Sequence, residues 1–346
     1  MLLQIDELHT LGNKIFENLG IDSRTRNSIV HALVLAELEG IPSHGFSRIP
    51  YYAAQVLSGK IRKNAQCTIN SPSHSVVIVN ANHGFAFPAL EKGLFGALMQ
   101  AARMGVSLFT VQHSHHCGVL GLYAERAAED GMIALLFSNT PAAVAPWSSR
   151  EALFGTNPLA FGCPRRNADP LVIDMSLSMA ARGRILLAKQ KGEKIPAGWA
   201  RDKNGQPTSD PAEALQGTLL PFGGYKGSAL GLIVEILTAA LSASSYSFQA
   251  SSFFTAQGPA PDVSQTGIII NPKMINPCFS EHLEELVAKI LLQETIRLPG
   301  AHRIHLKNEN IRKGVVLNDN LYDKLMLLSK THNLQEQEDL SEKLCS

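Results

Sequence analysis

Residues 106–131 read VSLFTVQHSHHCGVLGLYAERAAEDG, and this one stretch contains the alternation that reveals the fold class. The apolar run at 106–111 predicts a buried strand, and the apolar spacing at 119–130 predicts a helix after a short polar turn. Further apolar runs lie at 76–79, 132–138, 171–173 and 266–270, and further helical patterns at 86–104 and 228–243. These runs are short and separated by turn signals such as Asn204-Gly205, so we expect an α+β fold on a mixed sheet with some antiparallel pairing.

Helices are expected at both ends of the chain. Apolar residues recur at helical spacing from Leu8 to Leu19, and Gly20 follows as a stop. A second helix is expected from Ser23, capped by Asp22 or Ser23, to the stop at Gly40-Ile41-Pro42. Two more are expected near 282–293 and 319–330, and the polar tail 331–346 is expected to be solvated or frayed. The pattern predicts a helical domain of residues 1–75 plus 280–346 and an α+β domain of residues 76–279.

Composition excludes several classes of protein. The chain has 346 residues, 45% of them apolar, and a formal net charge of +1, so it can bury a sizeable core and lacks the positive charge of a nucleic-acid binder. Its five cysteines form no C-x-x-C pair, which argues against a disulfide framework and favours a reducing cytoplasm. The start, MLLQIDELHT, does not read as a signal peptide, and the most apolar window, 227–245, contains Glu235 and reads as a buried helix.

Two common nucleotide-binding motifs are absent from the sequence. No G-x-G-x-x-G follows a predicted strand, and no G-x-x-x-x-G-K-[ST] occurs. An ordinary Rossmann dehydrogenase and a P-loop NTPase are therefore disfavoured.

Ser43-His44-Gly45, with Arg48 close behind, brings a hydroxyl, an imidazole and a guanidinium together. Histidine exchanges protons near neutral pH, and arginine binds a carboxylate through two parallel hydrogen bonds. The cluster therefore suits a small carboxylic acid that must be protonated. The competing interpretation is a solvated loop with a helix-capping serine.

The histidines of the opening stretch allow three interpretations. His113, His115 and His116 could hold the metal of a hydrolase, but neighbouring residues on an extended chain point to opposite faces, and no metal ligand is assigned. Backbone N–H groups at the following helix start, near Gly118 and Gly121, could instead meet a phosphate. The third interpretation is a polar turn that ends a buried strand.

Two glycine-containing loops are further candidates. They cover 154–158 and 221–228, and the second leads into the most apolar helix with a lysine, Lys226, at its start. This combination is typical of a pyrophosphate site. Glu235 inside that helix could be catalytic, although pairing with neighbouring polar groups is the commoner role for such a carboxylate.

Taken together, these segments resemble the malate/L-lactate dehydrogenase type-2 family, which includes Δ1-piperideine-2-carboxylate/Δ1-pyrroline-2-carboxylate reductase. The resemblance covers nearly the whole chain. The segments that carry it are SHGFSRIPYYAAQVLSGKI (43–61), HSHHCGVLGLYAERAAEDG (113–131), LFGTNPLAFGCP (153–164), IDMSLSMAARGRI (173–185), IPAGWARDKNGQPTSDP (195–211), LLPFGGYKGSAL (219–230) and RLPGAHR (297–303).

The resemblance implies a homodimer that binds NAD(P)H on a non-Rossmann α+β domain and transfers hydride to the carbon beside a carboxylate. It implies His44 as proton donor, Ser43 as the hydroxyl that orients it, and His116 as a second candidate acid or base. The implied substrate residues are Arg48, Thr156, Arg182 and Gly183. The implied cofactor residues are His116, Cys117, Gly118, Val119, Leu120, Asp174, Met175, Ser176, Tyr225, Lys226, Gly300, Ala301, His302, Arg303, Ile304 and His305.

One departure bears on the substrate. The imine reductases of the family have an aspartate that completes a Ser/His/Asp relay where this chain has Arg184, and a histidine where it has Arg182. An arginine cannot accept a proton from histidine or fix its tautomer. We therefore expect an oxidoreductase of small 2-oxo acids. The alternatives are a reductase of cyclic 2-imino acids, a metal hydrolase on the histidine cluster, and an inactive dinucleotide-binding dimer.

Overall fold

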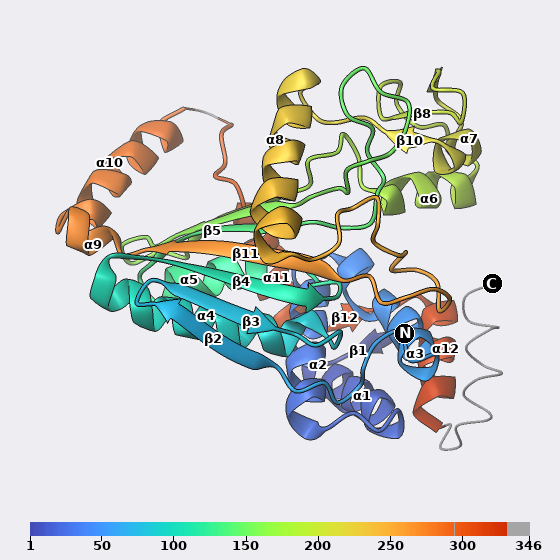
Figure 1. Cartoon of the computed structure of the whole chain (residues 1–346), viewed down its shortest axis with the longest axis horizontal. Helices are drawn as coiled ribbons and strands as arrows, with labels where there is room; N and C mark the ends of the chain where they lie inside the picture. Colours follow the sequence, from blue (N-terminus) through green and yellow to red (C-terminus); the bar gives the residue numbers. More distant parts are fainter. Residues whose placement is uncertain (294, 331–346) are drawn as a thin grey trace.

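The computed structural model describes residues 1–293 and 295–330; the tail expected to be solvated, 331–346, lies outside them. A seven-stranded mixed sheet forms the centre of the fold (Figure 1). All neighbouring strands in it are antiparallel except β3 and β4, which are parallel. In spatial order the strands are β2 (Thr68–Ser73), β3 (Val76–Asn80), β4 (Val106–Ser114), β11 (Val263–Ile270), β5 (Ile133–Ser138), β6 (Leu159–Cys163) and β7 (Leu171–Met175). The expected mixed sheet is confirmed.

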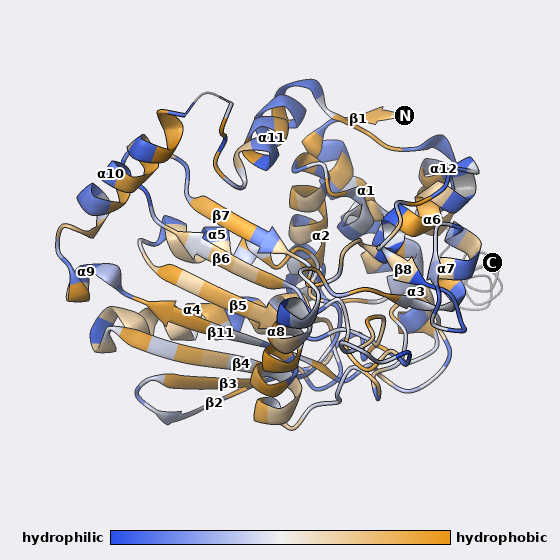
Figure 2. Ribbon diagram, turned by 90° about the horizontal axis from the view of Figure 1, so that it is seen from above, coloured by the Kyte–Doolittle hydropathy of each residue, from blue (hydrophilic) through white to orange (hydrophobic). Residues whose placement is uncertain are grey.

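Helices cover the two faces of this sheet unequally. The helices α4 (Ala86–Met104) and α5 (Gly121–Glu129) pack on one face, where Leu90, Phe109 and Leu136 belong to one buried cluster. The other face carries α8 (Tyr225–Glu235) and its π-helical continuation Ile236–Ala240 (Figures 1 and 2). No helix in the described part of the chain is long and apolar enough to cross a membrane.

The two ends of the chain pack together in a second core. It is built by α1 (Ile5–Asn18), α2 (Ser23–Leu38), α3 (Ile49–Leu57) and α12 (Asp319–Lys330), and strand β1 (Leu2–Leu3) pairs with β12 (Val315–Val316). The Asp22 side chain accepts a hydrogen bond from the Thr25 amide, which confirms the expected cap of α2. The helices predicted from the terminal patterns are therefore present.

A third, smaller group of elements lies beyond the sheet. It contains α6 (Arg182–Lys191), α7 (Pro211–Gln216) and a three-stranded sheet of β8 (Ala200–Arg201), β9 (Pro207–Thr208) and β10 (Thr218–Leu219). The remaining helices are α9 (Pro272–Ile275), α10 (Phe279–Leu291) and α11 (Ala301–Lys313). The sequence patterns did not predict β2, β6, α6 or α11.

Candidate active site

Ser43, His44 and Arg48 lie on two short 3-10 turns, Pro42–His44 and Phe46–Arg48, between α2 and α3. Ser43 Oγ and His44 Nδ1 are 2.9 Å apart, a hydrogen-bond distance. Arg48 Nε donates to the Ser43 carbonyl oxygen over 2.6 Å. The structure therefore brings together the three groups that the sequence analysis singled out here.

Arg48 is buried but not fully satisfied. Only 8% of it is exposed, and its Nη1 has no hydrogen-bond partner among the described residues. Its guanidinium lies over the Phe254 ring, 4.6 Å from the centroid. A buried guanidinium nitrogen without a partner is costly, and a carboxylate is the group that matches its geometry. The site therefore has an unfilled requirement for an anion.

His44 lies in a positive environment. Burial, with the charges of Arg48 and Arg303, lowers its pKa from 6.5 to about 3. In the described part of the chain no carboxylate hydrogen bonds to Ser43 or His44, whose side chains contact each other while the Ser43 carbonyl accepts from Arg48. The imidazole is therefore neutral at physiological pH.

A second imidazole lies beside the first. The rings of His44 and His116 are 5.3 Å apart between centroids. His116 Nδ1 is 2.6 Å from the Tyr52 hydroxyl, and its ring packs against Phe253. Burial and the Arg48 charge lower the pKa of His116 well below its ordinary value. His116 therefore lies directly beside His44, buried between Tyr52 and Phe253.

The three histidines proposed as a hydrolytic metal site do not converge. His115 Nε2 is 2.7 Å from the Gln55 side-chain oxygen, whereas His113 Nδ1 is 2.7 Å from an Asp262 oxygen. His116 bonds to Tyr52 instead. The metal-hydrolase alternative on this trio is wrong, because the chain turns sharply here and each imidazole points to a different partner.

The other substrate candidates lie on the facing elements. Gly183 begins α6 close to Ser43, since a Cβ built on it would lie 4.0 Å from the Ser43 Cβ. Its neighbours Arg182 and Arg184 are exposed, and Arg182 donates to the Leu215 carbonyl.

Thr156 belongs to the loop before β6. Its hydroxyl lies 3.3 Å from that of Thr140, and its carbonyl accepts hydrogen bonds from Ser176 and Leu177. No contact between Thr156 and His44 is present among the described residues.

Asp174 and Leu177, at and just after the end of β7, connect the predicted cofactor segments. Asp174 Oδ2 accepts a hydrogen bond from the Gly121 amide over 3.0 Å and lies 3.3 Å from Arg303 Nη1. The amide of Phe222, close to Tyr225, donates to the Leu177 carbonyl. Segments 116–120, 174–176 and 300–305 therefore meet, and the loop before α8 joins them through residue 177.

The anion at the start of α5 is a carboxylate of the chain itself. The Gly121 amide, which the sequence predicted as a phosphate-binding donor, donates its hydrogen bond to the Asp174 carboxylate instead. Cys117 and Leu120 are buried in the core beneath the sheet, and Val119 packs against Ala36. Gly118, with φ +70°, makes the turn between them. In the 116–120 segment, His116 and the main chain are the groups placed to meet a ligand.

In the loop before α8, two glycines leave the main chain uncovered by side chains. Gly223 and Gly224 have φ of +60° and +64°, and a Cβ on Gly223 would meet no atom within 4 Å. Tyr225 and Lys226 are exposed beside Trp147, and Lys226 has no ion pair in the described residues. Two left-handed glycines that present a helix start next to a free lysine fit a phosphate group.

The α11 segment borders a cavity of about 330 Å³. Gly300 has φ +81°, and a Cβ on it would lie only 2.6 Å from the Val172 carbonyl oxygen, so a larger residue would clash there. Ala301, Ile304 and His305 line the cavity, His302 is exposed, and Met175 is 39% exposed at the end of β7. These positions provide space and main-chain groups that could meet a ligand. The Arg303 side chain, in contrast, is already paired with Asp174.

Four residues of the site were not predicted. Tyr52 and Gln55 lie on α3, one and two turns after Arg48, and helical spacing from the arginine could have found them. Phe253 and Phe254 come from a loop about two hundred positions further along the chain. No local pattern connects that loop with α3.

Glu235 has the structural role that the commoner interpretation assigned to it. Its carboxylate accepts hydrogen bonds from the Asn157 side chain and from both the amide and hydroxyl of Ser247. It is buried and fully partnered, so it holds the loops 154–158 and 246–248 to the helix.

Comparison with known proteins identifies the family. The family model for malate/L-lactate dehydrogenase matches residues 3–326. Over 308 residues the chain is 44% identical to a (2R)-3-sulfolactate dehydrogenase (NADP(+)) of Chromohalobacter salexigens, covering 89% of this chain and 92% of that protein. Over 315 residues it is 34% identical to a Delta(1)-pyrroline-2-carboxylate/Delta(1)-piperideine-2-carboxylate reductase of Pseudomonas putida, covering 90% and 92%.

Solved structures agree. The delta1-piperideine-2-carboxylate reductase from Pseudomonas syringae pv. tomato matches with a TM-score of 0.89 at 33% identity, covering 95% of this chain and 99% of that one. The sulfolactate dehydrogenase from Methanocaldococcus jannaschii also has a TM-score of 0.89, at 29% identity, covering 97% and 99%. The chain therefore belongs to the malate/L-lactate dehydrogenase family and is an oxidoreductase.

Proposed function

We propose that this protein interconverts a small 2-hydroxy acid and its 2-oxo acid with NADP(H), and that the substrate carries a second acidic group. The observation that supports this most directly is the buried Arg48 with its unpartnered Nη1. A substrate carboxylate would satisfy that nitrogen by a charge-assisted hydrogen bond. One relative is named (2R)-3-sulfolactate dehydrogenase (NADP(+)), and the substrate and cofactor in that name belong to the classes proposed here.

The proton chemistry is assigned to His44. When bound, a reduced nicotinamide supplies hydride to the substrate carbon next to the carboxylate. His44, oriented by Ser43, gives a proton to the developing alkoxide oxygen, and in the reverse direction it takes the proton from the hydroxyl. Its low pKa requires that the substrate anions first partly neutralise Arg48, which raises the pKa of His44 in the complex.

A second acidic group on the substrate explains the arginines at the start of α6. Arg182 and Arg184 flank Gly183, whose Cβ position lies 4.0 Å from the Ser43 Cβ. Together with Arg48 and Arg303, whose charges act on His44, they supply positive charge that a monoanionic cyclic imine would leave largely unbalanced. The absence of the relay aspartate in the described residues points in the same direction. This favours a dianion such as a sulfonate-bearing or dicarboxylic 2-hydroxy acid.

The cofactor site is assigned to the segments joined by residues 174–177. The open Gly223-Gly224 turn, the free Lys226 and the Trp147 ring provide backbone donors, charge and a stacking surface, which fit a dinucleotide. A Rossmann fold needs a parallel sheet, and only β3 and β4 are parallel here. We therefore propose dinucleotide binding outside a Rossmann fold.

The division of the chain is part of the same proposal. We assign residues 1–75 and 280–346 to a helical domain and residues 76–279 to the domain that binds cofactor and substrate, except that β2 (Thr68–Ser73) pairs with β3 in the central sheet. The joint core of α1, α2, α3 and α12 supports the first of these. The arm formed by α10 lies apart from that core, against the loop after β6, where Glu284 pairs with Arg165.

A substrate panel tests the function. We would follow oxidation of NADPH and of NADH with pyruvate, oxaloacetate, sulfopyruvate, Δ1-pyrroline-2-carboxylate and Δ1-piperideine-2-carboxylate. The proposal expects kcat/KM with NADPH to be highest for oxaloacetate or sulfopyruvate, by at least about tenfold, since each good ion pair contributes on the order of 1.4 kcal/mol. Preference for the imines would replace the proposal with the imine-reductase alternative, and cofactor binding without turnover would support an inactive protein.

A further inference from the structure

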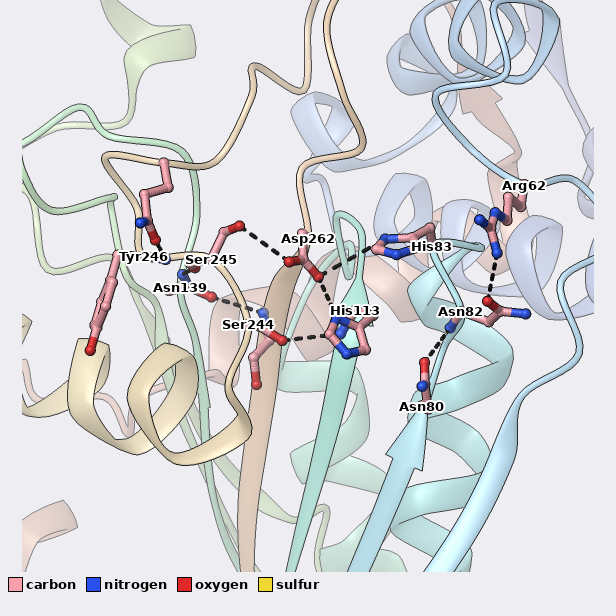
Figure 3. A network of polar contacts seen from close by, with 12 residues as sticks. Arg62, Asn80, Asn82, His83, His113, Asn139, Ser244, Ser245, Tyr246 and Asp262 are labelled. Atoms are coloured by element: carbon pink, nitrogen blue, oxygen red, sulfur yellow. Dashed lines mark hydrogen bonds and ion pairs between the residues drawn. The ribbon is translucent and has the colours of Figure 1, made fainter.

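His83, His113 and Asp262 meet at one end of three neighbouring strands of the central sheet (Figure 3). His83 follows the end of β3, His113 is next to last in β4, and Asp262 immediately precedes β11. Strands β3 and β4 are parallel, and β11 runs antiparallel to β4. The C-terminal ends of β3 and β4 and the N-terminal end of β11 therefore lie at the same end of the sheet. Three adjacent strands thus deliver three potential metal ligands to one point.

The distances suit a small cation. His113 Nδ1 lies 2.7 Å and His83 Nδ1 3.9 Å from Asp262 Oδ1. One ligand atom from each residue lies within 4.8 Å of the other two. In a tetrahedral zinc site with bonds of about 2.0–2.2 Å, the ligand atoms lie about 3.3–3.5 Å apart. The two measured separations bracket this value, so small side-chain rotations would complete the geometry.

All three residues have the same uncommon backbone conformation. His83, His113 and Asp262 have φ of +58°, +52° and +54°. A non-glycine residue in the left-handed region costs on the order of 1 kcal/mol, and such residues cluster at functional sites. The left-handed backbone occurs at each of the three strand ends, and the side chains of His83, His113 and Asp262 point toward one another there (Figure 3).

One ligand atom has no partner of its own. His83 Nδ1 is buried and makes no hydrogen bond within the described residues. The Asp262 carboxylate, in contrast, is oriented by the Ser245 hydroxyl over 3.2 Å. A metal ion would satisfy the unpartnered nitrogen and use a carboxylate that is already positioned.

The three side chains are also accessible. His83 and His113 are each 32% exposed and Asp262 24% exposed, which leaves an entry path and room for water as a further ligand. Two imidazoles and one carboxylate are the donors preferred by divalent transition metals rather than by Ca²⁺ or Mg²⁺. We propose that His83, His113 and Asp262 bind one divalent transition-metal ion, such as Zn²⁺, that ties together the ends of β3, β4 and the start of β11. The site is independent of the proposed hydride transfer.

Metal binding to the full chain tests this inference. Protein treated with a chelator and dialysed is titrated with Zn²⁺ against a chromogenic competitor, and with Co²⁺ to record the absorption that reports its coordination. The test variants are His83→Asn and Asp262→Asn, because asparagine tolerates the left-handed backbone that both positions require. The matched control is His74→Asn, which removes an exposed imidazole from the turn between β2 and β3.

The expected result is one Zn²⁺ per chain for wild type and His74→Asn, with an affinity lowered at least about tenfold in both test variants. Zn²⁺ should also raise the thermal midpoint of wild type but not of the test variants, since a ligand of the folded state stabilises it. Equal affinity in all four proteins, or a Co²⁺ spectrum of the hexa-aqua ion in wild type, would overturn the proposal. The Co²⁺ spectrum needs no variant, so the test holds even if a substitution impairs folding.

Discussion

Burial and then the neighbouring positive charges lower the pKa of His44, and the charges set the order of two measurable pKa values. In the enzyme without substrate its pKa is lowered to about 3 by burial and by Arg48 and Arg303. A bound dianion offsets those charges and raises the pKa. For oxidation of the hydroxy acid, we expect the acid-side pKa in kcat to exceed that in kcat/KM, because the first reports the substrate complex and the second the protein without substrate. Identical values in the two profiles would contradict this role for His44.

Replacing His44 separates the two candidate imidazoles. His44→Gln removes the titrating ring, and we expect kcat to fall by roughly 10² to 10⁴, the usual contribution of a positioned acid or base. The dissociation constant for NADPH, measured by fluorescence, should stay within a factor of about three. His116→Gln is the companion variant; a larger loss of kcat there than in His44→Gln would transfer the proton-donor role to His116.

Arg48 tests recognition of the substrate carboxylate. Arg48→Lys keeps the charge but removes the planar fork that matches a carboxylate, so kcat/KM for the 2-oxo acid should fall about 100-fold, roughly 3 kcal/mol. Arg126→Lys, on an exposed surface of α5, is the control and should leave kcat/KM unchanged. Full activity of Arg48→Lys would show that a point charge is sufficient and that no bidentate pair forms.

Among the elements, the two 3-10 turns depend on close packing against α2. Gly45 lies against the Glu37 carboxylate, which accepts a hydrogen bond from the Phe46 amide over 2.6 Å. A methyl group on Gly45 would overlap that carboxylate. This contact sets the position of the turns, and therefore of Ser43 and His44, relative to the helix.

Gly45→Ala should disturb both stability and activity. Displacing Glu37 overpacks the site and leaves the buried Phe46 amide without its acceptor, so the free energy of unfolding should fall by about 1–3 kcal/mol, with a loss of kcat. The control is Gly96→Ala in α4, where the new methyl would meet only Val77 side-chain atoms at 3.3 Å. Urea unfolding and kinetics check both variants, and a Gly45→Ala protein as stable as Gly96→Ala would refute the packing argument.

Helix α2 ends at a carboxylate whose titration should be visible in stability. Burial, then the neighbouring Glu125 charge, raises the pKa of Glu39 from 4.5 to about 7, although Lys307 and Arg303 oppose the shift. The folded state therefore holds this proton more tightly than the unfolded state. The stability from this group is complete below about pH 4.5 and is lost as pH rises through about 7.

Glu39→Gln mimics the protonated form and removes this dependence. Near pH 5 its free energy of unfolding should be close to that of wild type, and near pH 9 it should exceed wild type by up to about 3 kcal/mol. Glu193→Gln, on an exposed loop, is the control and should track wild type at both pH values. Parallel pH profiles for wild type and Glu39→Gln would contradict a shifted carboxyl.

On the scale of the whole molecule, one face of the sheet is covered by α8 alone, and that helix is apolar on its outer side as well. Leu232, Ile233, Ile236 and Leu241 are each about half exposed, and Phe248 lies exposed on the following loop. Exposed apolar patches of this kind mark interfaces between chains. We therefore assign the interface of the predicted homodimer to α8 and its π-helical continuation.

Ile236→Glu tests the predicted homodimer and its interface. In sedimentation we expect twice the mass of the chain for wild type and the mass of a single chain for the variant, because a carboxylate buried in an apolar interface costs several kcal/mol. Leu286→Glu, which charges an exposed apolar position on α10, is the matched control and should remain dimeric. Dissociation of the Leu286 variant alone would move the interface to α10.

The sequence alone was sufficient where the relevant signal is local. Helical spacing and a capping aspartate predicted α1 and α2, and apolar runs predicted β3, β4, β5, β7 and β11. All of these except the half-buried β7 bury side chains in the core. Ser43, His44 and Arg48 lie within six residues, so their meeting followed from the chain itself. Two of the missed elements lack this signal, since β2 is exposed at every position and α11 buries no residue. Strand β6 was missed although it buries Ala160 and Cys163.

The tertiary structure decided what depends on residues distant in the sequence. It separated His113, His115 and His116, and it brought His113 to Asp262, 149 positions away. It placed Phe253 against His116 and joined the start of α5 to Arg303 through Asp174. Periodicity reports which face of an element is buried, but the identity of the partner depends on sheet order and strand direction, which arise only when the whole chain packs.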